Sequence, residues 1–97
     1  MDETEASAIL KSHVDRLRGL TYAELRDRYL GEVEALEQTG DSGSEYQLEI
    51  EAFWDDPRVK DGNLQVMVAI DDGRGWRAFA PLTESFIRAP DGSFVGE

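Results

Sequence analysis

The chain has 97 residues, a formal net charge of −11 and a hydrophobic share of 40%. This length supports one hydrophobic core, so we expect a single domain over residues 1–97. The absence of cysteine excludes disulfides, thiolate metal ligands and cysteine nucleophiles. The excess of acid argues against binding to nucleic acid or to an anionic membrane, and the acidic start without a long apolar run predicts a cytoplasmic protein.

Two helices are expected at the start of the chain. Residues 2–18 carry apolar side chains at helical spacing and are followed by Gly19, which predicts an amphipathic helix. Thr21 and Glu24 form the pattern of a capping box, which predicts a short second helix from Tyr22 to about Tyr29.

The rest of the chain has the pattern of strands. Residues 32–39 and 45–54 flank the turn-rich stretch TGDSGS and predict a hairpin, although the good helix formers in residues 32–38 leave a longer second helix open. Residues 64–70 form the clearest strand pattern, and a fourth strand is expected from Trp76 to Pro81. A small C-terminal hairpin is predicted around APDG, with residues 85–88 and 93–95 as its arms. We therefore expect an α+β fold, with the helices packed on a four-stranded antiparallel meander.

Symmetric turns would fix how these strands pair. They place Val33 opposite Ile50, and they extend this pair into an apolar row across the sheet. The row consists of Val33, Ile50, Val68 and Ala78. We expect the first helix to pack on this face.

The same registers predict acidic and apolar side chains on the other face. Glu32 would lie opposite Glu51 and Glu34 opposite Glu49, with Arg77 and Arg88 near enough to relieve the repulsion. Met67 and Phe79 would be in contact, with Phe53 diagonal to them. Such a patch is typical of a contact surface, unless the second helix or the C-terminal hairpin covers it. The predicted interaction residues are Phe53, Met67, Phe79, Glu32, Glu34, Glu49 and Glu51.

No catalytic, cofactor or metal site is predicted. His13 is the only histidine and lies on or beside the apolar stripe of the first helix, so a structural role is favoured over that of a general base. The aspartates around Gly62 lack the ligand spacing of a calcium loop and are typical of turns. Trp76 with Arg74 and Arg77 could stack on nucleic acid, but the acidic charge of the chain favours packing of Trp76 on the core.

The stretches YQLEIEAFWDD, NLQVMVAIDDG and APLTESFIRAPDGSFVGE, with the helix start LTYAEL, resemble a family of small uncharacterised bacterial proteins of unknown function. The resemblance covers roughly residues 45–97 and implies no activity, cofactor or site. The expected architecture is similar to the cystatin-like, cone-shaped α+β folds, some of which bind small ligands in the concavity of the sheet.

Three functions follow as hypotheses. The first is a non-catalytic interaction or regulatory module, which binds a second copy of the chain or another protein through the apolar patch. The second is a ligand-binding or enzymatic cone with a pocket between the first helix and the sheet. The third is an acidic inhibitor or immunity-like protein that binds a basic partner.

Overall fold

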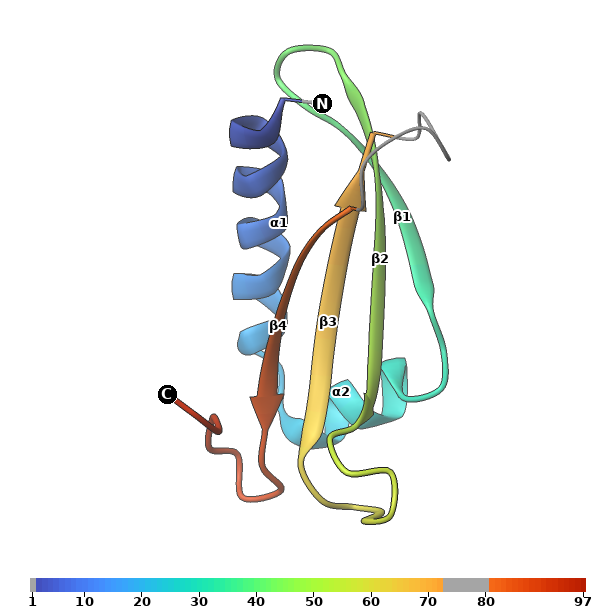
Figure 1. The fold of residues 1–97 in the computed structure, drawn as a ribbon, viewed down its shortest axis with the longest axis vertical. Coiled ribbons are helices and arrows are strands. Elements are labelled where there is room, and N and C mark those ends of the chain that lie inside the picture. The colour runs from blue at the N-terminus through green and yellow to red at the C-terminus, as the bar shows by residue number, and fades with distance from the viewer. Residues whose placement is uncertain (1, 73–80) are drawn as a thin grey trace.

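The computed structural model describes residues 2–72 and 81–97. These residues form two helices, four strands and their connections. The elements in chain order are α1 (Glu3–Arg18), α2 (Tyr22–Tyr29), β1 (Glu34–Thr39), β2 (Glu45–Trp54), β3 (Leu64–Asp71) and β4 (Leu82–Arg88). The strands form one open antiparallel sheet in the order β1-β2-β3-β4. Helix α1 runs along the sheet and α2 crosses one end of it (Figure 1), which confirms the predicted α+β class.

Local capping determines where the helices begin. Asp2 caps α1 by accepting a hydrogen bond from the Glu5 N–H at 3.1 Å. Thr21 and Glu24 form the predicted capping box, with both hydrogen bonds at 3.1 Å. Helix α2 ends at Tyr29, and Gly31 has a φ of 73°. This left-handed conformation is easy for glycine, and the chain turns there from α2 toward β1.

The hydrophobic core lies between the helices and the even-numbered residues of the strands. Both helices pack on this same face of the sheet. Helix α1 contributes Leu10 and Leu17, and α2 contributes Leu25 and Tyr29. The fully buried strand residues are Leu48, Ile50, Leu64, Val66, Val68 and Ile70.

The register of β1 with β2 differs from the prediction by one residue. Glu34 lies opposite Ile50, where Val33 was predicted, and β1 begins at Glu34. The cause is a longer turn, residues 40–44, in which the Gly40 N–H donates to the Ser44 carbonyl at 2.8 Å. Because side chains alternate along a strand, this shift moves Leu36 to the core face and Ala35 to the opposite face. The helix alternative for this segment is wrong.

The register of β2 with β3 is the predicted one, but the partner of β3 on its other side is not. Val68 lies opposite Glu84, where Ala78 was predicted. The strand predicted from Trp76 falls within residues 73–80, which lie outside the described residues. Strand β4 follows Pro81, where a missing N–H costs no ladder hydrogen bond. A glutamate on the core face weakens the alternation of β4, and this explains why the sequence indicated only residues 85–88 of it, as an arm of the C-terminal hairpin.

The predicted C-terminal hairpin forms with a short second arm. Residues 85–88 belong to β4, and the returning chain pairs with them through the bridge between Arg88 and Phe94, where the Val95 N–H donates to the Ile87 carbonyl at 2.9 Å. The turn itself has the predicted form, since the Gly92 N–H donates to the Ala89 carbonyl at 2.9 Å.

Glu5 joins the first turn of α1 to the turn between β1 and β2. Its carboxylate accepts hydrogen bonds from the Ser42 N–H at 3.0 Å, the Ser42 hydroxyl at 2.6 Å and the Tyr46 hydroxyl at 2.7 Å. The bonds from Ser42 and then the bond from Tyr46 lower the pKa of Glu5 below its usual value of 4.5. The bond to Glu5, followed by burial, raises the pKa of Tyr46 from 10.0 to about 12.

We expect this cluster to make stability depend on pH at both extremes. The ionised Glu5 accepts these bonds, so its contribution is present above pH 4.5 and is lost as the pH falls through the lowered pKa. The neutral Tyr46 hydroxyl contributes below pH 10.0, and this contribution is lost as the pH rises toward about 12. Urea unfolding of the wild type and Tyr46→Phe should therefore differ most near neutral pH. A difference that is constant with pH would contradict this expectation.

Gly40 provides a second test of the hydrogen bonds that Glu5 accepts from Ser42 and Tyr46. A Cβ at this position would overlap the Glu5 carboxylate, so Gly40→Ala should displace that flexible side chain and break its hydrogen bonds. In a Glu5→Ala background, Gly40→Ala should change the free energy of unfolding only a little. The double-mutant cycle thus separates loss of the Glu5 bonds from any change in the turn itself.

Tyr29 carries the only buried side-chain oxygen in the described part of the chain that has no hydrogen-bond partner. A buried hydroxyl without a partner is unfavourable, so Tyr29→Phe should leave the free energy of unfolding unchanged or raise it by up to about 1 kcal/mol. Tyr22→Phe is the matched control, because the Tyr22 hydroxyl donates to the Gly62 carbonyl at 2.7 Å. Loss of this hydrogen bond in Tyr22→Phe should lower the free energy of unfolding by about 1 kcal/mol. Urea titration measures the free energy of unfolding of both variants. A clear decrease for Tyr29→Phe would contradict this expectation, because it would mean that the Tyr29 hydroxyl makes a stabilising hydrogen bond.

Candidate functional site

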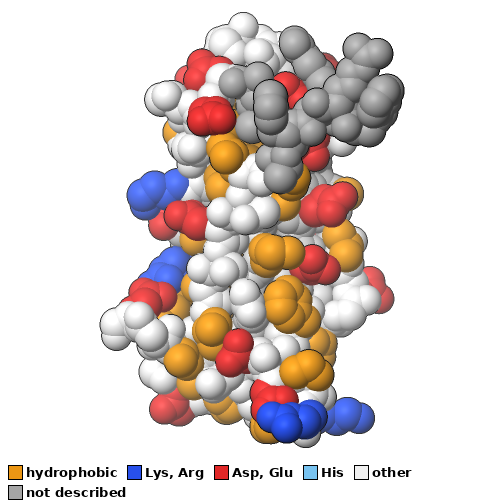
Figure 2. Space-filling model, in the orientation of Figure 1, with side chains coloured by type: hydrophobic (Ala, Val, Ile, Leu, Met, Phe, Trp, Pro, Cys, Tyr) orange, Lys and Arg blue, Asp and Glu red, His pale blue; other side chains and the backbone are white. Residues whose placement is uncertain are grey.

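The face of the sheet opposite the helices is the candidate site, and we call it the open face. It is formed by the odd-numbered residues of the strands, and α1 and α2 both pack on the other side. Figure 2 shows hydrophobic side chains gathered over the strands, with acidic side chains between them. The members of the open face are Ala35, Glu37, Thr39, Glu45, Gln47, Glu49, Glu51, Phe53, Gln65, Met67, Ala69, Asp71, Thr83, Ser85 and Ile87.

The strand registers bring the apolar members of the open face together. Phe53 lies opposite Gln65, which in turn lies opposite Ile87. Met67 lies between Glu51 and Ser85 in the next row. Phe53 and Ile87 thus lie on either side of Gln65, and both are diagonal to Met67, at the end of the sheet where β2 ends and β3 begins.

Four of the predicted interaction residues lie on this face, namely Phe53, Met67, Glu49 and Glu51. The predicted neighbour of Met67, Phe79, lies outside the described residues, and Ser85 occupies the position opposite Met67. The alternatives in which α2 or the C-terminal turn covers the patch are wrong for the described residues. Helix α2 packs on the core face, and Phe94 after the turn packs on the core and on Phe86.

The predicted pairs of opposed glutamates do not form. Glu49 lies opposite Ala35, because of the shift in the β1 register. Glu34 is on the helix side of the sheet, where the Arg28 Nε donates to its carboxylate at 3.2 Å. Glu32 precedes β1, so it has no strand partner.

Glu32 and Glu51 instead line the same groove, which we call the corner groove. It is open to solvent and has a volume of about 460 Å³. The groove exists because β2 continues past the start of β1, so that on the β1 side only the bridge between Leu30 and Ala52 flanks this part of β2. The lining residues are Leu30, Gly31, Glu32, Val33, Glu51, Ala52, Phe53, Trp54 and Pro57.

Two large apolar side chains of the corner groove are exposed. Val33 is 56% exposed and Phe53 is 38% exposed. Sequence reasoning found Phe53 and the two glutamates, but it missed the groove because it placed Val33 in the core. The sequence does carry a signal for the groove. Residues 45–54, after TGDSGS, form a longer segment than residues 32–39 before it, so the longer strand extends past the shorter one.

The charges of the open face are all negative among the described residues. Arg88 is the only lysine or arginine in the four described strands, and it points away from this face. No ion pair joins Glu32, Glu49 or Glu51 to another described residue. These carboxylates are therefore available to a positively charged partner.

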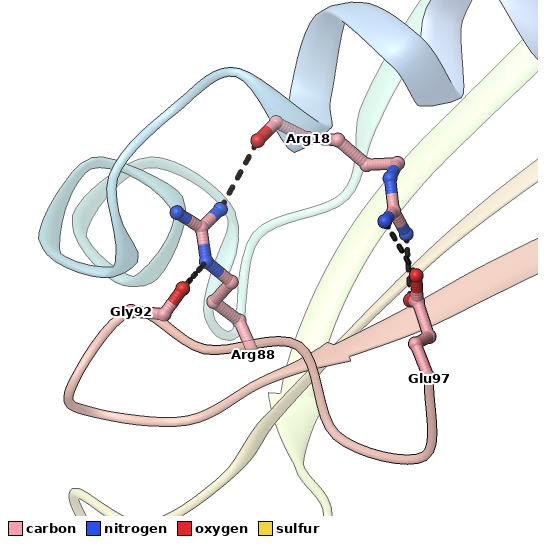
Figure 3. Close-up of polar contacts among 4 residues, drawn as sticks. All are labelled: Arg18, Arg88, Gly92 and Glu97. Carbon is pink, nitrogen blue, oxygen red and sulfur yellow. Dashed lines mark hydrogen bonds and ion pairs between the residues drawn. The ribbon is translucent and has the colours of Figure 1, made fainter.

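Arg88 was predicted to lie over the acids, but it connects β4 to the helices. Its guanidinium donates to the carbonyls of Gly92 at 2.7 Å, Leu20 at 2.8 Å and Arg18 at 3.2 Å. Arg18 donates twice to the Glu97 carboxylate, at 2.6 and 2.7 Å (Figure 3). This contact lowers the pKa of Glu97 and raises that of Arg18. Both guanidinium groups also lie within 4.4 Å of the Phe94 ring centre. We call this the C-terminal cluster.

His13 has a structural environment. One of its ring nitrogens, Nε2, is 2.7 Å from the Gln38 Oε1 and the other, Nδ1, is 3.1 Å from the Arg16 guanidinium. The arginine donates to Nδ1, so the neutral ring donates from Nε2 to Gln38. His13 thereby ties α1 to β1. The space between α1 and the sheet around it is filled by the buried side chains of the core.

In residues 2–72 and 81–97, no three histidines, cysteines or carboxylates lie where they could hold a metal ion. No described helix is long and apolar enough to cross a membrane. Comparisons of the chain with family models, curated proteins and solved structures find no match. The resemblance of residues 45–97 to a bacterial family stays a prediction.

Proposed function

We propose that this domain is a non-catalytic protein-interaction module that binds a partner protein through the open face and the corner groove. The observation that carries the proposal is the group of Phe53, Met67, Ile87 and Val33, which lies on the side that neither helix covers. Exposed apolar side chains that gather in one place typically mark contact surfaces, whereas single ones do not.

The acidic side chains around this group favour a basic partner. Glu49 and Glu51 lie beside the apolar side chains on β2, and Glu32 lines the corner groove. Such charged groups at a contact select partners and speed their association. A second copy of the chain is a less suitable partner, because each copy carries a net charge of −11 and would bring further carboxylates to the contact. The same charge supports the related hypothesis of an acidic inhibitor, which would use this surface against a basic protein.

An enzymatic or ligand-binding cone receives less support. That hypothesis requires a pocket between α1 and the sheet, and buried apolar side chains from both layers occupy this interface. His13, the candidate base, is held by Gln38 and Arg16. The corner groove is on the outside of the molecule and is lined mainly by apolar groups, which suits binding rather than acid–base chemistry.

Phe53→Asp tests the proposal, with Ala23→Asp as the control for the added charge. Ala23 is exposed on α2, which packs on the opposite side of the sheet, and it does not line the groove. A partner is first recovered with the wild-type protein, identified and purified, and its affinity for each variant is then measured by calorimetry. We expect Phe53→Asp to raise the Kd at least about tenfold, since a central aromatic anchor is lost. Ala23→Asp should leave the Kd nearly unchanged.

Two controls complete this experiment. Urea unfolding should place both variants close to the wild type in stability, because exposed substitutions usually change it by less than about 0.5 kcal/mol. Light scattering of the wild-type protein alone measures self-association. Equal affinities for Phe53→Asp and the wild type would overturn the proposed surface, and a dimer that Phe53→Asp dissociates would show that the partner is a second copy.

A further inference from the structure

Strand β1 forms a free edge of the sheet. The order β1-β2-β3-β4 gives β1 a neighbour on one side only among the described strands. The opposite edge strand, β4, is partly covered by the returning chain, since the Val95 N–H donates to the Ile87 carbonyl at 2.9 Å. An uncovered edge offers a row of backbone donors and acceptors to another extended chain.

The hydrogen bonds of the first turn determine which groups of β1 point outward. The Gly40 N–H donates to the Ser44 carbonyl, so the even-numbered residues of β1 exchange hydrogen bonds with β2 in this antiparallel register. The N–H and C=O groups of Ala35, Glu37 and Thr39 must therefore point away from β2. They present a regular ladder edge to an added strand.

The side chains near this edge determine the chemistry of such a strand. On the open face, an added strand would place alternate side chains beside Ala35 and Glu37, with Glu49 one strand further away. Neither glutamate has an ion pair with a described residue. Beyond the start of β1, the same strand would meet the corner groove with Val33 and Phe53. Positive side chains at alternate positions and an apolar side chain at one end would complement this surface.

We propose that the partner binds as an added β-strand, in which an extended basic segment pairs with β1 and places an apolar side chain in the corner groove. This inference rests on the proposed function and specifies the mode of binding. Main-chain hydrogen bonds to the edge supply part of the affinity, and the groove and glutamates supply specificity. Pairing of two β1 edges from two copies is disfavoured, because it would add the like charges of Glu34 and Glu37 to the contact.

Two synthetic peptides test the mode of binding directly. Each has about eight residues that alternate lysine and valine and end in phenylalanine, which is enough to span a strand such as β1. The second peptide has the same side chains but carries N-methyl groups on alternate residues, so that it cannot donate hydrogen bonds to an edge. We expect the first peptide to bind the wild-type protein at least about tenfold more tightly than the second. Binding should also slow hydrogen exchange at the amides of Ala35, Glu37 and Thr39.

Ala35→Pro tests main-chain pairing with β1 by a change in the protein instead of the peptide. Proline removes an N–H that points away from β2, so the β1–β2 ladder should persist, and Ala35→Ser is the control for a change of side chain. We expect Ala35→Pro, but not Ala35→Ser, to weaken binding of the unmethylated peptide about tenfold. Should Ala35→Pro fail to fold, the N-methylated peptide with wild-type protein still decides the question.

The outcomes separate this inference from the proposed function. Equal binding of both peptides, with loss of binding only in Phe53→Asp, would mean that the partner lies across the open face; the strand inference would be overturned and the proposed function would stand. No binding of either peptide, or pairing of two protein copies at this edge, would also overturn the inference. A Glu–Val peptide that binds as well as the Lys–Val peptide would overturn its charge requirement.

Discussion

Leu36→Asn is expected to lower the free energy of unfolding by about 2 kcal/mol, whereas Ala35→Asn should change it by less than about 0.5 kcal/mol. Leu36 packs on the core from β1, and asparagine has the same number of side-chain heavy atoms but would place an amide there. Ala35 is exposed on the open face, where an amide is solvated. Neither replacement changes the charge of the chain, so electrostatic repulsion does not affect the comparison.

This pair of variants decides between the two registers of β1. The symmetric turn that the sequence suggests would place Ala35 on the core face and Leu36 on the open face, and it would reverse the order of the two effects. Urea unfolding monitored by tryptophan fluorescence or circular dichroism measures both variants. The result also bears on the function, because the observed register is what leaves Val33 exposed in the corner groove.

Arg88→Ala is expected to lower the free energy of unfolding by about 2 to 3 kcal/mol. The guanidinium donates to three carbonyls, those of Arg18, Leu20 and Gly92, and its contact with the Phe94 ring would be lost as well. Hydrogen bonds to a charged group contribute more than neutral ones, and the partly buried carbonyls would lose their donor. Arg88→Lys should restore less than half of the loss, since an ammonium group cannot reach three acceptors in a fixed fork geometry.

The salt dependence of unfolding distinguishes Arg88 from its neighbour Arg18. The acceptors of Arg88 are neutral carbonyls, so the effect of Arg88→Ala should change little with ionic strength. Glu97→Gln removes an exposed ion pair with Arg18, and its smaller effect should shrink as salt is added. Hydrogen exchange should show faster opening of residues 89–97 in Arg88→Ala. A loss below about 0.5 kcal/mol would mean that these contacts are not a main link between β4 and the helices.

The open face and the corner groove depend both on local sequence patterns and on how the strands pair in the tertiary structure. Alternation along β2 indicated from sequence that Phe53, Glu49 and Glu51 share a face, because the two-residue period of a strand is a local property. The position of Met67 beside them was predicted correctly, since β2 and β3 have the predicted register. Neither Glu34 nor Val33 was placed correctly, because both positions depend on the length of one turn.

The sequence by itself determined the elements whose signals are local. The capping box of Thr21 and Glu24 fixed the start of α2, and periodicity fixed β2 and β3. These signals involve residues within a few positions of one another, so they act in the same way whatever the rest of the chain does.

Only the tertiary structure decided the register of β1, the identity of β4 and the role of Arg88. One additional residue in the turn after Thr39 turned Leu36 inward and exposed Val33. Strand β4 became the partner of β3 despite Glu84, because Leu82 and Phe86 pack on the core from the same face. Each of these outcomes depends on contacts between segments far apart in the chain, whose free energies the local pattern does not contain.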